Sequence, residues 1–199
     1  MNRILKQREK YNQIRTRLQD AKFKSKVVYL AIKGMQPTVL WCKLLWNNPA
    51  SPRAQFTLWL ACHDRLAMKE RLHRFQLIDS PICVFCTNVE TTQHLFFDCP
   101  GTRDIWYQIL KWIWVLHHPS NWKTELDWFI KSCKGRGWKS ILLKCAATET
   151  IYHTWKYKNA KFFGKDIHRN KIVKDILDAT AYRVWENRKV RKQLAMIMV

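Results

Sequence analysis

The sequence is poor in acidic residues, in glycine and in proline. Its 199 residues include only 15 Asp and Glu against 36 Lys and Arg, which gives a formal net charge of +21. Only 5 Gly and 6 Pro are present, while 47% of the residues are hydrophobic. This composition argues against whole-chain disorder and predicts a folded core. The charge favours a partner that is anionic, such as nucleic acid, an anionic membrane or an acidic protein.

Long hydrophobic runs are also missing. The most apolar window, residues 105–116, is too short to cross a bilayer and contains Lys111. The first ten residues hold no apolar stretch like the core of a secretory signal, and the number of cysteines, seven, is odd. We therefore expect an intracellular protein with reduced thiols and no membrane anchor.

Several catalytic motifs are absent as well. The sequence has no G-x-x-x-x-G-K, H-E-x-x-H or G-x-S-x-G motif. A zinc deaminase needs a glutamate two residues after a histidine, but Arg65 and Phe75 stand there after His63 and His73. We expect no enzyme activity, no catalytic residue and no small-molecule substrate.

The hydrophobic pattern is helical, because i, i+3, i+4 spacing is common and strict alternation is scarce. It predicts an all-α protein, with Thr102 as the N-cap of one helix. The helices are expected near residues 2–24, 38–46, 52–63, 67–75, 102–116, 122–132, 138–163 and 167–189.

Positive charge is concentrated at the two ends of the chain. Residues 1–35 hold 10 Lys and Arg against 2 Asp and Glu, and residues 131–199 hold 17 against 5. We predict a basic helical segment over 1–35, a helical domain over 38–118 and a basic helical region over 120–199. We expect the near-neutral middle to fold without a polyanionic partner and the basic ends to bind that partner.

A metal-site pattern lies in the middle of the chain: Cys83, Cys86, His94 and Cys99 have the spacing C-x2-C-x7-H-x4-C. One tight turn can present the first two sulfurs to a metal. His94 and Cys99 would be about 140° apart on a continuous helix. Because Pro100 disfavours helical backbone at Cys99, we expect Cys99 just past the end of a short helix that carries His94.

These four residues match the tetrahedral thiolate and imidazole sites that zinc prefers, and four protein ligands fill the coordination shell. We therefore predict a structural Zn²⁺ that organises the helical domain, with His63 and His73 as possible substitute ligands. Segment 83–99 contains Glu90 and Asp98 but no Lys or Arg, so it should bind phosphate poorly. The other cysteines lie in apolar helical patterns and are expected to be packed thiols: Cys42, Cys62, Cys133 and Cys145.

Basic residues interleaved with aromatics characterise the C-terminal region. A helical projection of residues 155–165 places Trp155 and Phe162 inside and the lysines outside, which makes the lysines candidates for phosphate contact. A second basic cluster, residues 188–192, also resembles a nuclear-import signal, which favours a nuclear over a cytoplasmic location. The predicted nucleic-acid contacts are Lys158, Lys161, Lys165, Arg188, Lys189, Arg191 and Lys192.

The stretch from Phe56 to Leu72, followed by the block 83–100, closely resembles the reverse-transcriptase zinc-binding domain of plant LINE-type (non-LTR) retrotransposon polyproteins. Residues 150–164 are similar to the helix that follows that domain, so the resemblance covers roughly 39–190. It implies the same four zinc ligands and a module that follows a polymerase domain and helps to hold element RNA or DNA. Ala67-Met68 departs from the family, which commonly has a threonine there to cap the next helix.

Polymerase activity does not follow from this resemblance, because no two aspartates adjoin and the Asp-Asp pair of the polymerase site is missing. The leading hypothesis is a non-catalytic, zinc-stabilised module that binds RNA or DNA through its basic flanks. The alternatives are a protein-interaction scaffold and an inactive retrotransposon remnant, both with a structural zinc.

Overall fold

The computed structural model describes residues 8–9, 12, 29, 39–135, 137–188 and 190–192. The chain divides into two compact units, residues 1–39 and residues 40–199, and the fold described below is that of the second unit. Lys189 and most of the helix predicted over residues 2–24 lie outside the described residues.

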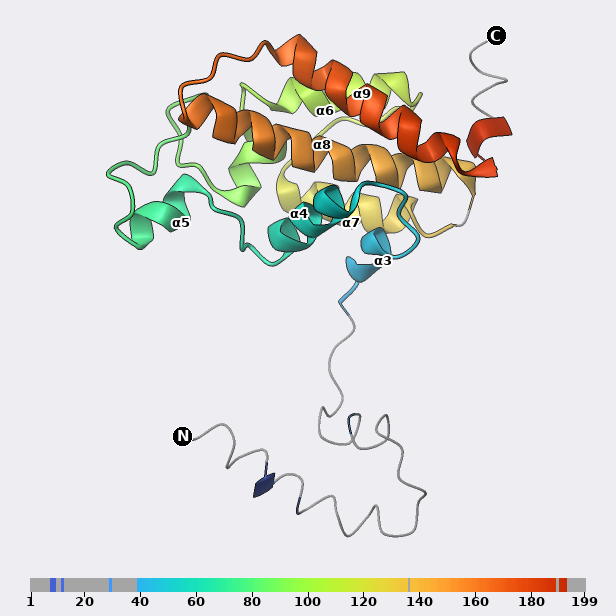
Figure 1. Cartoon of the computed structure of the whole chain (residues 1–199), viewed down its shortest axis with the longest axis horizontal. Helices are drawn as coiled ribbons and strands as arrows, with labels where there is room; N and C mark the ends of the chain where they lie inside the picture. The colour runs from blue at the N-terminus through green and yellow to red at the C-terminus, as the bar shows by residue number, and fades with distance from the viewer. Residues whose placement is uncertain are drawn as a thin grey trace. The chain divides into compact units, whose positions relative to one another are not determined.

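The second unit is helical, and its described residues contain no β-strand (Figure 1). This confirms the all-α prediction and the helices expected after residue 38. No helix in the described ranges is long and apolar enough to span a membrane. In chain order the elements are α3 (Cys42–Leu45), α4 (Pro52–Cys62), α5 (Lys69–Arg74), the π-helix η1 (His94–Asp98), α6 (Arg103–Trp112), α7 (Trp122–Ser132), α8 (Trp138–Phe162) and α9 (Arg169–Trp185).

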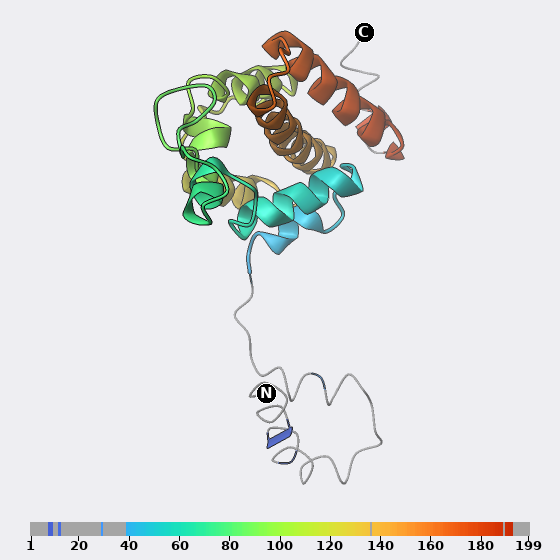
Figure 2. The same ribbon diagram turned by 60° about the vertical axis from the view of Figure 1, so that its left-hand side comes forward.

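Helix α8 lies at the centre of this unit, and α4, α6, α9 and η1 all contact it. Figure 2 shows the other helices arranged around it, with α9 antiparallel to α8. Leu142, Ala146 and Ile151 are each buried, although they do not share one narrow face. A helix that is apolar on several sides is buried by neighbours on several sides, which is why α8 takes the central position.

One hydrophobic core joins the regions that the sequence assigned to separate domains. Leu58 of α4, Trp106 of α6, Ile151 of α8 and Ile176 of α9 belong to the same buried cluster. The predicted boundary between residues 118 and 120 therefore does not separate two cores. The physical reason is that α4 and α6 bury their apolar faces against α8.

Buried polar contacts fix the loop between α3 and α4 on α8. The Asn48 amide donates to the Leu44 carbonyl oxygen at 2.8 Å and to the Thr148 hydroxyl at 2.7 Å. The Ser51 backbone N–H donates to Glu149 Oε1 at 2.7 Å, and the Ser51 hydroxyl caps α4 by accepting from Ala54 N. These bonds hold residues 46–51 against the N-terminal half of α8.

Candidate metal centre

The first ligand pair lies in a tight turn, as its two-residue gap predicts. Cys83 N donates to the Asn88 carbonyl oxygen at 2.8 Å, and Glu90 N donates to the Pro81 oxygen at 2.9 Å. These bonds close a short antiparallel turn around Cys83 and Cys86, and they direct both sulfurs to one point.

The second ligand pair is positioned by the π-helix η1. Cys99 lies just past its end, in extended conformation with φ −65° and ψ 125°, and Pro100 follows. Cys99 N donates to the His94 carbonyl oxygen at 2.8 Å, and this i→i+5 bond brings Cys99 back over His94. The prediction of a short helix that ends before Cys99 is confirmed, but its π-type turn could not be read from the sequence. Three consecutive buried side chains anchor the turn in the core: Leu95, Phe96 and Phe97.

The four ligand atoms converge, all lying within 4.8 Å of one another. Cys99 Sγ is 3.8 Å from Cys83 Sγ and 3.9 Å from Cys86 Sγ, and Cys86 Sγ is 3.1 Å from His94 Nε2. Zinc–sulfur bonds of about 2.3 Å in a tetrahedron place two sulfurs about 3.8 Å apart. The chemistry and spacing of this Cys₃His set therefore fit Zn²⁺.

Neither of the possible substitute ligands belongs to this group. His63 instead packs its ring against Trp41 and Trp59, with centroid distances of 5.0 and 4.6 Å. The remaining cysteines also lie outside the group. Burial raises the pKa of Cys133 to about 12, as expected of a packed thiol.

Hydrogen bonding makes the two buried ligand thiols unequal. A hydrogen bond joins the Cys83 and Cys99 sulfurs, and it is the main cause that lowers the pKa of Cys99 to about 5 and raises that of Cys83. Backbone N–H of Gly101 also stabilises the Cys99 thiolate. Zinc binds sulfur as the thiolate, and binding the ion replaces the remaining thiol protons.

Glu90 connects segment 83–99, the metal loop, to the start of α5. Its Oε1 accepts from Lys69 N at 2.9 Å, and its carbonyl oxygen accepts from Glu70 N at 3.2 Å. These bonds satisfy the first N–H groups of α5, where the N-cap Met68 offers no side-chain bond. Glu90 thus replaces the threonine cap that the sequence lacks at Ala67-Met68. Sequence reasoning missed this role; the one signal was an acidic residue in a segment without Lys or Arg.

Close packing behind Cys99 requires a glycine. A Cβ on Gly101 would lie 2.5 Å from Cβ of Phe85, which stands between the first two ligands. Thr102 occupies the predicted N-cap position of α6, but its side chain makes no cap bond. Its hydroxyl donates instead to the Leu95 carbonyl oxygen and so ties α6 to η1.

The prediction that Lys158 shares an exposed lysine face is wrong. Its side chain is 2% exposed, and its ammonium is 2.9 Å from Glu90 Oε1 and donates to the Ala67 oxygen at 2.9 Å. A projection of α8 alone could not show that the metal loop and Ala67 cover this side of the helix. Lys158 is therefore not accessible to a phosphate group.

The remaining predicted contacts that the structure describes are exposed, and they form two separate groups. Lys161 and Lys165 lie at the C-terminal end of α8. Arg188, Arg191 and Lys192 follow α9, whose end lies beside the start of α8 (Figure 1). Because the 25 residues of α8 span about 37 Å, the two groups do not form one patch.

Comparison with known proteins agrees with the metal centre. Residues 23–106 match the family model for zinc-binding in reverse transcriptase. An Arabidopsis thaliana protein named "Putative ribonuclease H protein" is 26% identical over 136 residues, which cover 66% of this chain and 22% of that protein. The chain thus aligns with about a fifth of that relative. No solved structure gives a significant match. The resemblance to the reverse-transcriptase zinc-binding domain is confirmed over the matched residues.

Proposed function

We propose that this chain, whose residues 23–106 match the zinc-binding domain of reverse transcriptases, is a non-catalytic nucleic-acid-binding module. Its zinc holds η1 and the preceding turn in place on the helical core. RNA or DNA binds outside the metal centre, through exposed lysine and arginine side chains. We further propose that the module derives from a plant LINE-type retrotransposon and acts in the nucleus.

The observation that carries this proposal is that the exposed positive charge lies on helical segments and not on the segment that supplies the metal ligands. Four protein ligands fill the zinc shell, which leaves no position for water or substrate. Segment 83–99 has no Lys or Arg, whereas Lys161 and Lys165 are exposed at the C-terminal end of α8, next to the part of the helix that contacts this segment. Phosphate contacts need accessible cations, so the interface lies on the helices rather than at the metal.

The test is filter binding of a 20-nucleotide RNA and the matching DNA at several salt concentrations. We expect affinity to fall steeply with salt, because each phosphate contact releases counterions. Replacing Lys161 and Lys165 together with Gln should weaken binding to all sequences alike and flatten the salt slope by about two units or less. Wild-type protein that binds neither nucleic acid at low salt would contradict the proposal.

A protein-interaction scaffold is the second candidate, because aromatic side chains are exposed on α4. Phe56 and Trp59 stack with a centroid distance of 5.7 Å, yet they are 58% and 39% exposed. Exposed apolar clusters mark protein interfaces. Replacing both residues with Ser should leave nucleic-acid binding unchanged if this face serves a protein partner, and should weaken it if the rings stack on bases. An inactive remnant would bind neither class of partner.

A further inference from the structure

Lys144 of α8 is a buried cation without a counter-ion. The residue is 9% exposed, and its ammonium donates to the Trp46 carbonyl oxygen at 3.5 Å. No carboxylate of the described residues lies within 4.0 Å of it. A buried charge is costly unless it is paired and hydrogen-bonded. The described residues around Lys144 do not supply the anion that would pair it.

Lys158, on the same helix, shows how this fold treats a buried lysine that serves structure. Its ammonium has a carboxylate partner in Glu90 and a carbonyl acceptor in Ala67, both at 2.9 Å. Lys144 has one long hydrogen bond instead. Lys144 is 9% and Lys158 1% exposed, so both are buried. They differ in pairing, and we take this difference to separate a structural role from a binding role.

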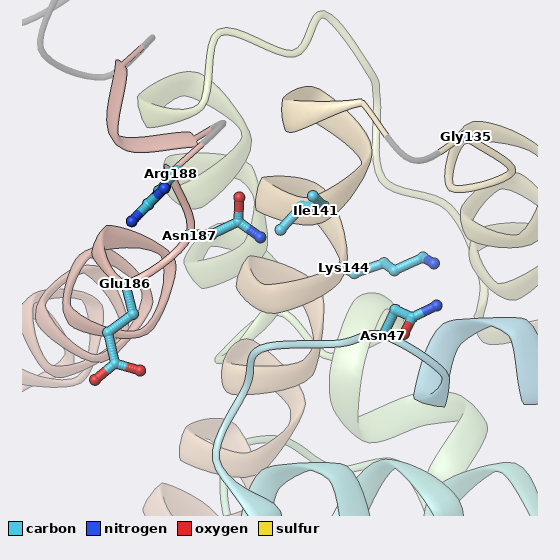
Figure 3. Close-up of a pocket in the computed structure, with 7 residues that line it drawn as sticks. All are labelled: Asn47, Gly135, Ile141, Lys144, Glu186, Asn187 and Arg188. Atoms are coloured by element: carbon cyan, nitrogen blue, oxygen red, sulfur yellow. The ribbon is translucent and has the colours of Figure 1, made fainter.

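Lys144 lines an open pocket of about 640 Å³, between the α3–α4 loop, the start of α8 and the residues after α9. Figure 3 shows Lys144 and Asn47 on one side and Arg188 on the other, with Ile141 between them. The carboxylate of Glu186 points away from Lys144 in this view. In the same view the side chains of Lys144 and Asn47 point the same way, whereas that of Arg188 points in the opposite direction, so one anion can meet the Lys144 ammonium and the Asn47 amide but not Arg188 as well.

We propose that this pocket binds a phosphate group, with Lys144 as its buried counter-charge. An anion beside Lys144 would supply the ion pair that the protein does not provide. Asn47 suits this anion because its side-chain amide can donate a second hydrogen bond beside the ammonium. The pocket volume falls in the range of small-molecule sites, so it has room for a sugar or base attached to the phosphate.

The phosphate comes either from a nucleic-acid backbone or from a free ion or nucleotide. The first case rests on the proposed function and deepens it, because Arg188, a member of one of the two exposed basic groups, lines the other side of the same pocket. The phosphate site itself depends only on the lysine and the pocket. Two measurements therefore separate the site from the source of its ligand.

The first measurement is thermal unfolding in sodium phosphate against sodium chloride at equal ionic strength. Ligand that binds only the folded state raises the melting temperature. We expect phosphate to raise the melting temperature of the wild type and of Lys144→Arg. Lys144→Met should bind phosphate at least tenfold more weakly. The control Lys156→Met changes an exposed lysine of the same helix and should respond as the wild type does.

Equal stabilisation of wild type and Lys144→Met by phosphate, or none in the wild type at 50 mM phosphate, overturns the proposal. If Lys144→Met unfolds early, phosphorus NMR of the wild type and of Asn47→Gly tests the site instead. Glycine can adopt the positive φ of 54° at this position, and phosphate line broadening seen with the wild type should be weaker with Asn47→Gly.

The second measurement is oligonucleotide binding by the same variants. A backbone phosphate in the pocket predicts that Lys144→Met lowers the salt slope by about one unit. If the ligand is a free phosphate, Lys144→Met should bind the oligonucleotide as the wild type does but should lose the phosphate-dependent shift in melting temperature. Both results support the site. If the wild type bound no oligonucleotide, the proposed function would be rejected. The phosphate-dependent shift in melting temperature would still test the phosphate site by itself.

Discussion

Glu90 of the metal loop and Lys158 of α8 form a buried ion pair, with 2.9 Å between Oε1 and Nζ. Their side chains are 0% and 2% exposed, and the second carboxylate oxygen, Oε2, has no hydrogen-bond partner. The pair joins the zinc-binding region to the long basic helix across 68 positions of sequence. Metal binding and the packing of α8 are therefore expected to depend on one another.

Breaking this pair should be costly. We expect Lys158→Met to lower the free energy of unfolding by about 3–5 kcal/mol, because it leaves the Glu90 carboxylate buried and unpaired. The double variant Glu90→Gln with Lys158→Met should recover part of the loss. Urea unfolding measures both changes. Lys144→Met is the matched control: it removes an unpaired buried charge and should cost far less. Equal destabilisation by the two lysine variants would contradict the assigned roles.

One zinc ion per chain should support folding. Metal analysis of purified protein should give about one zinc per chain, and Cys86→Ser should lower both the metal content and the melting temperature. Structural zinc contributes about 10–16 kcal/mol of apparent binding energy in small peptides, although a larger core lowers this dependence. Cys42→Ser changes a cysteine outside the Cys₃His group and should retain zinc. Metal-free wild type with undiminished stability would rule out the structural role.

A methyl group at Gly101 should disturb the metal turn. The added Cβ would lie 2.5 Å from Phe85 Cβ, so Gly101→Ala should cost about 1–3 kcal/mol through overpacking and weaken zinc binding. Gly135→Ala is the control, because the nearest heavy atom to its Cβ would be 3.7 Å away. Chelator competition and thermal unfolding measure the two effects, and similar values for both variants would show that the Phe85 contact is unimportant.

His153 should make stability depend on pH. Burial lowers the pKa of His153 to about 4 from its ordinary value of 6.5. Between these values the unfolded chain binds a proton that the folded protein does not, so stability falls as pH drops from 6.5 to 4. Relative to His153→Gln, the wild type should lose about 2–3 kcal/mol across this window, from about 1.4 kcal/mol for each unit of pKa difference. The difference between variants cancels protonation of the zinc ligands.

Urea unfolding at pH 7.5 and pH 4.5 measures this effect. His118→Gln changes an exposed histidine and should follow the wild type at both values. A pH-independent difference between His153→Gln and the wild type would show that His153 is not protected from protonation.

Much of the local structure and the metal ligands could be predicted from sequence. Periodicity located the helices after residue 38, because each helix must bury one of its own faces. Spacing and residue type identified Cys83, Cys86, His94 and Cys99, since zinc needs these donors close together. Pro100 predicted the backbone of Cys99 through a steric effect between neighbouring residues.

The tertiary structure alone decided which distant segments cover each face of α8. Lys158 looked exposed on an isolated helix, but Glu90 and Ala67 close over it. Glu125 likewise gained its role from packing, because it accepts from Trp106 Nε1 at 3.1 Å and from Ser120 N at 2.8 Å. Helical spacing describes one element at a time, whereas burial and ion pairing depend on contacts between elements. The sequence by itself therefore determined the helices and the zinc ligands, and the fold decided which lysines are buried, paired or open to a ligand.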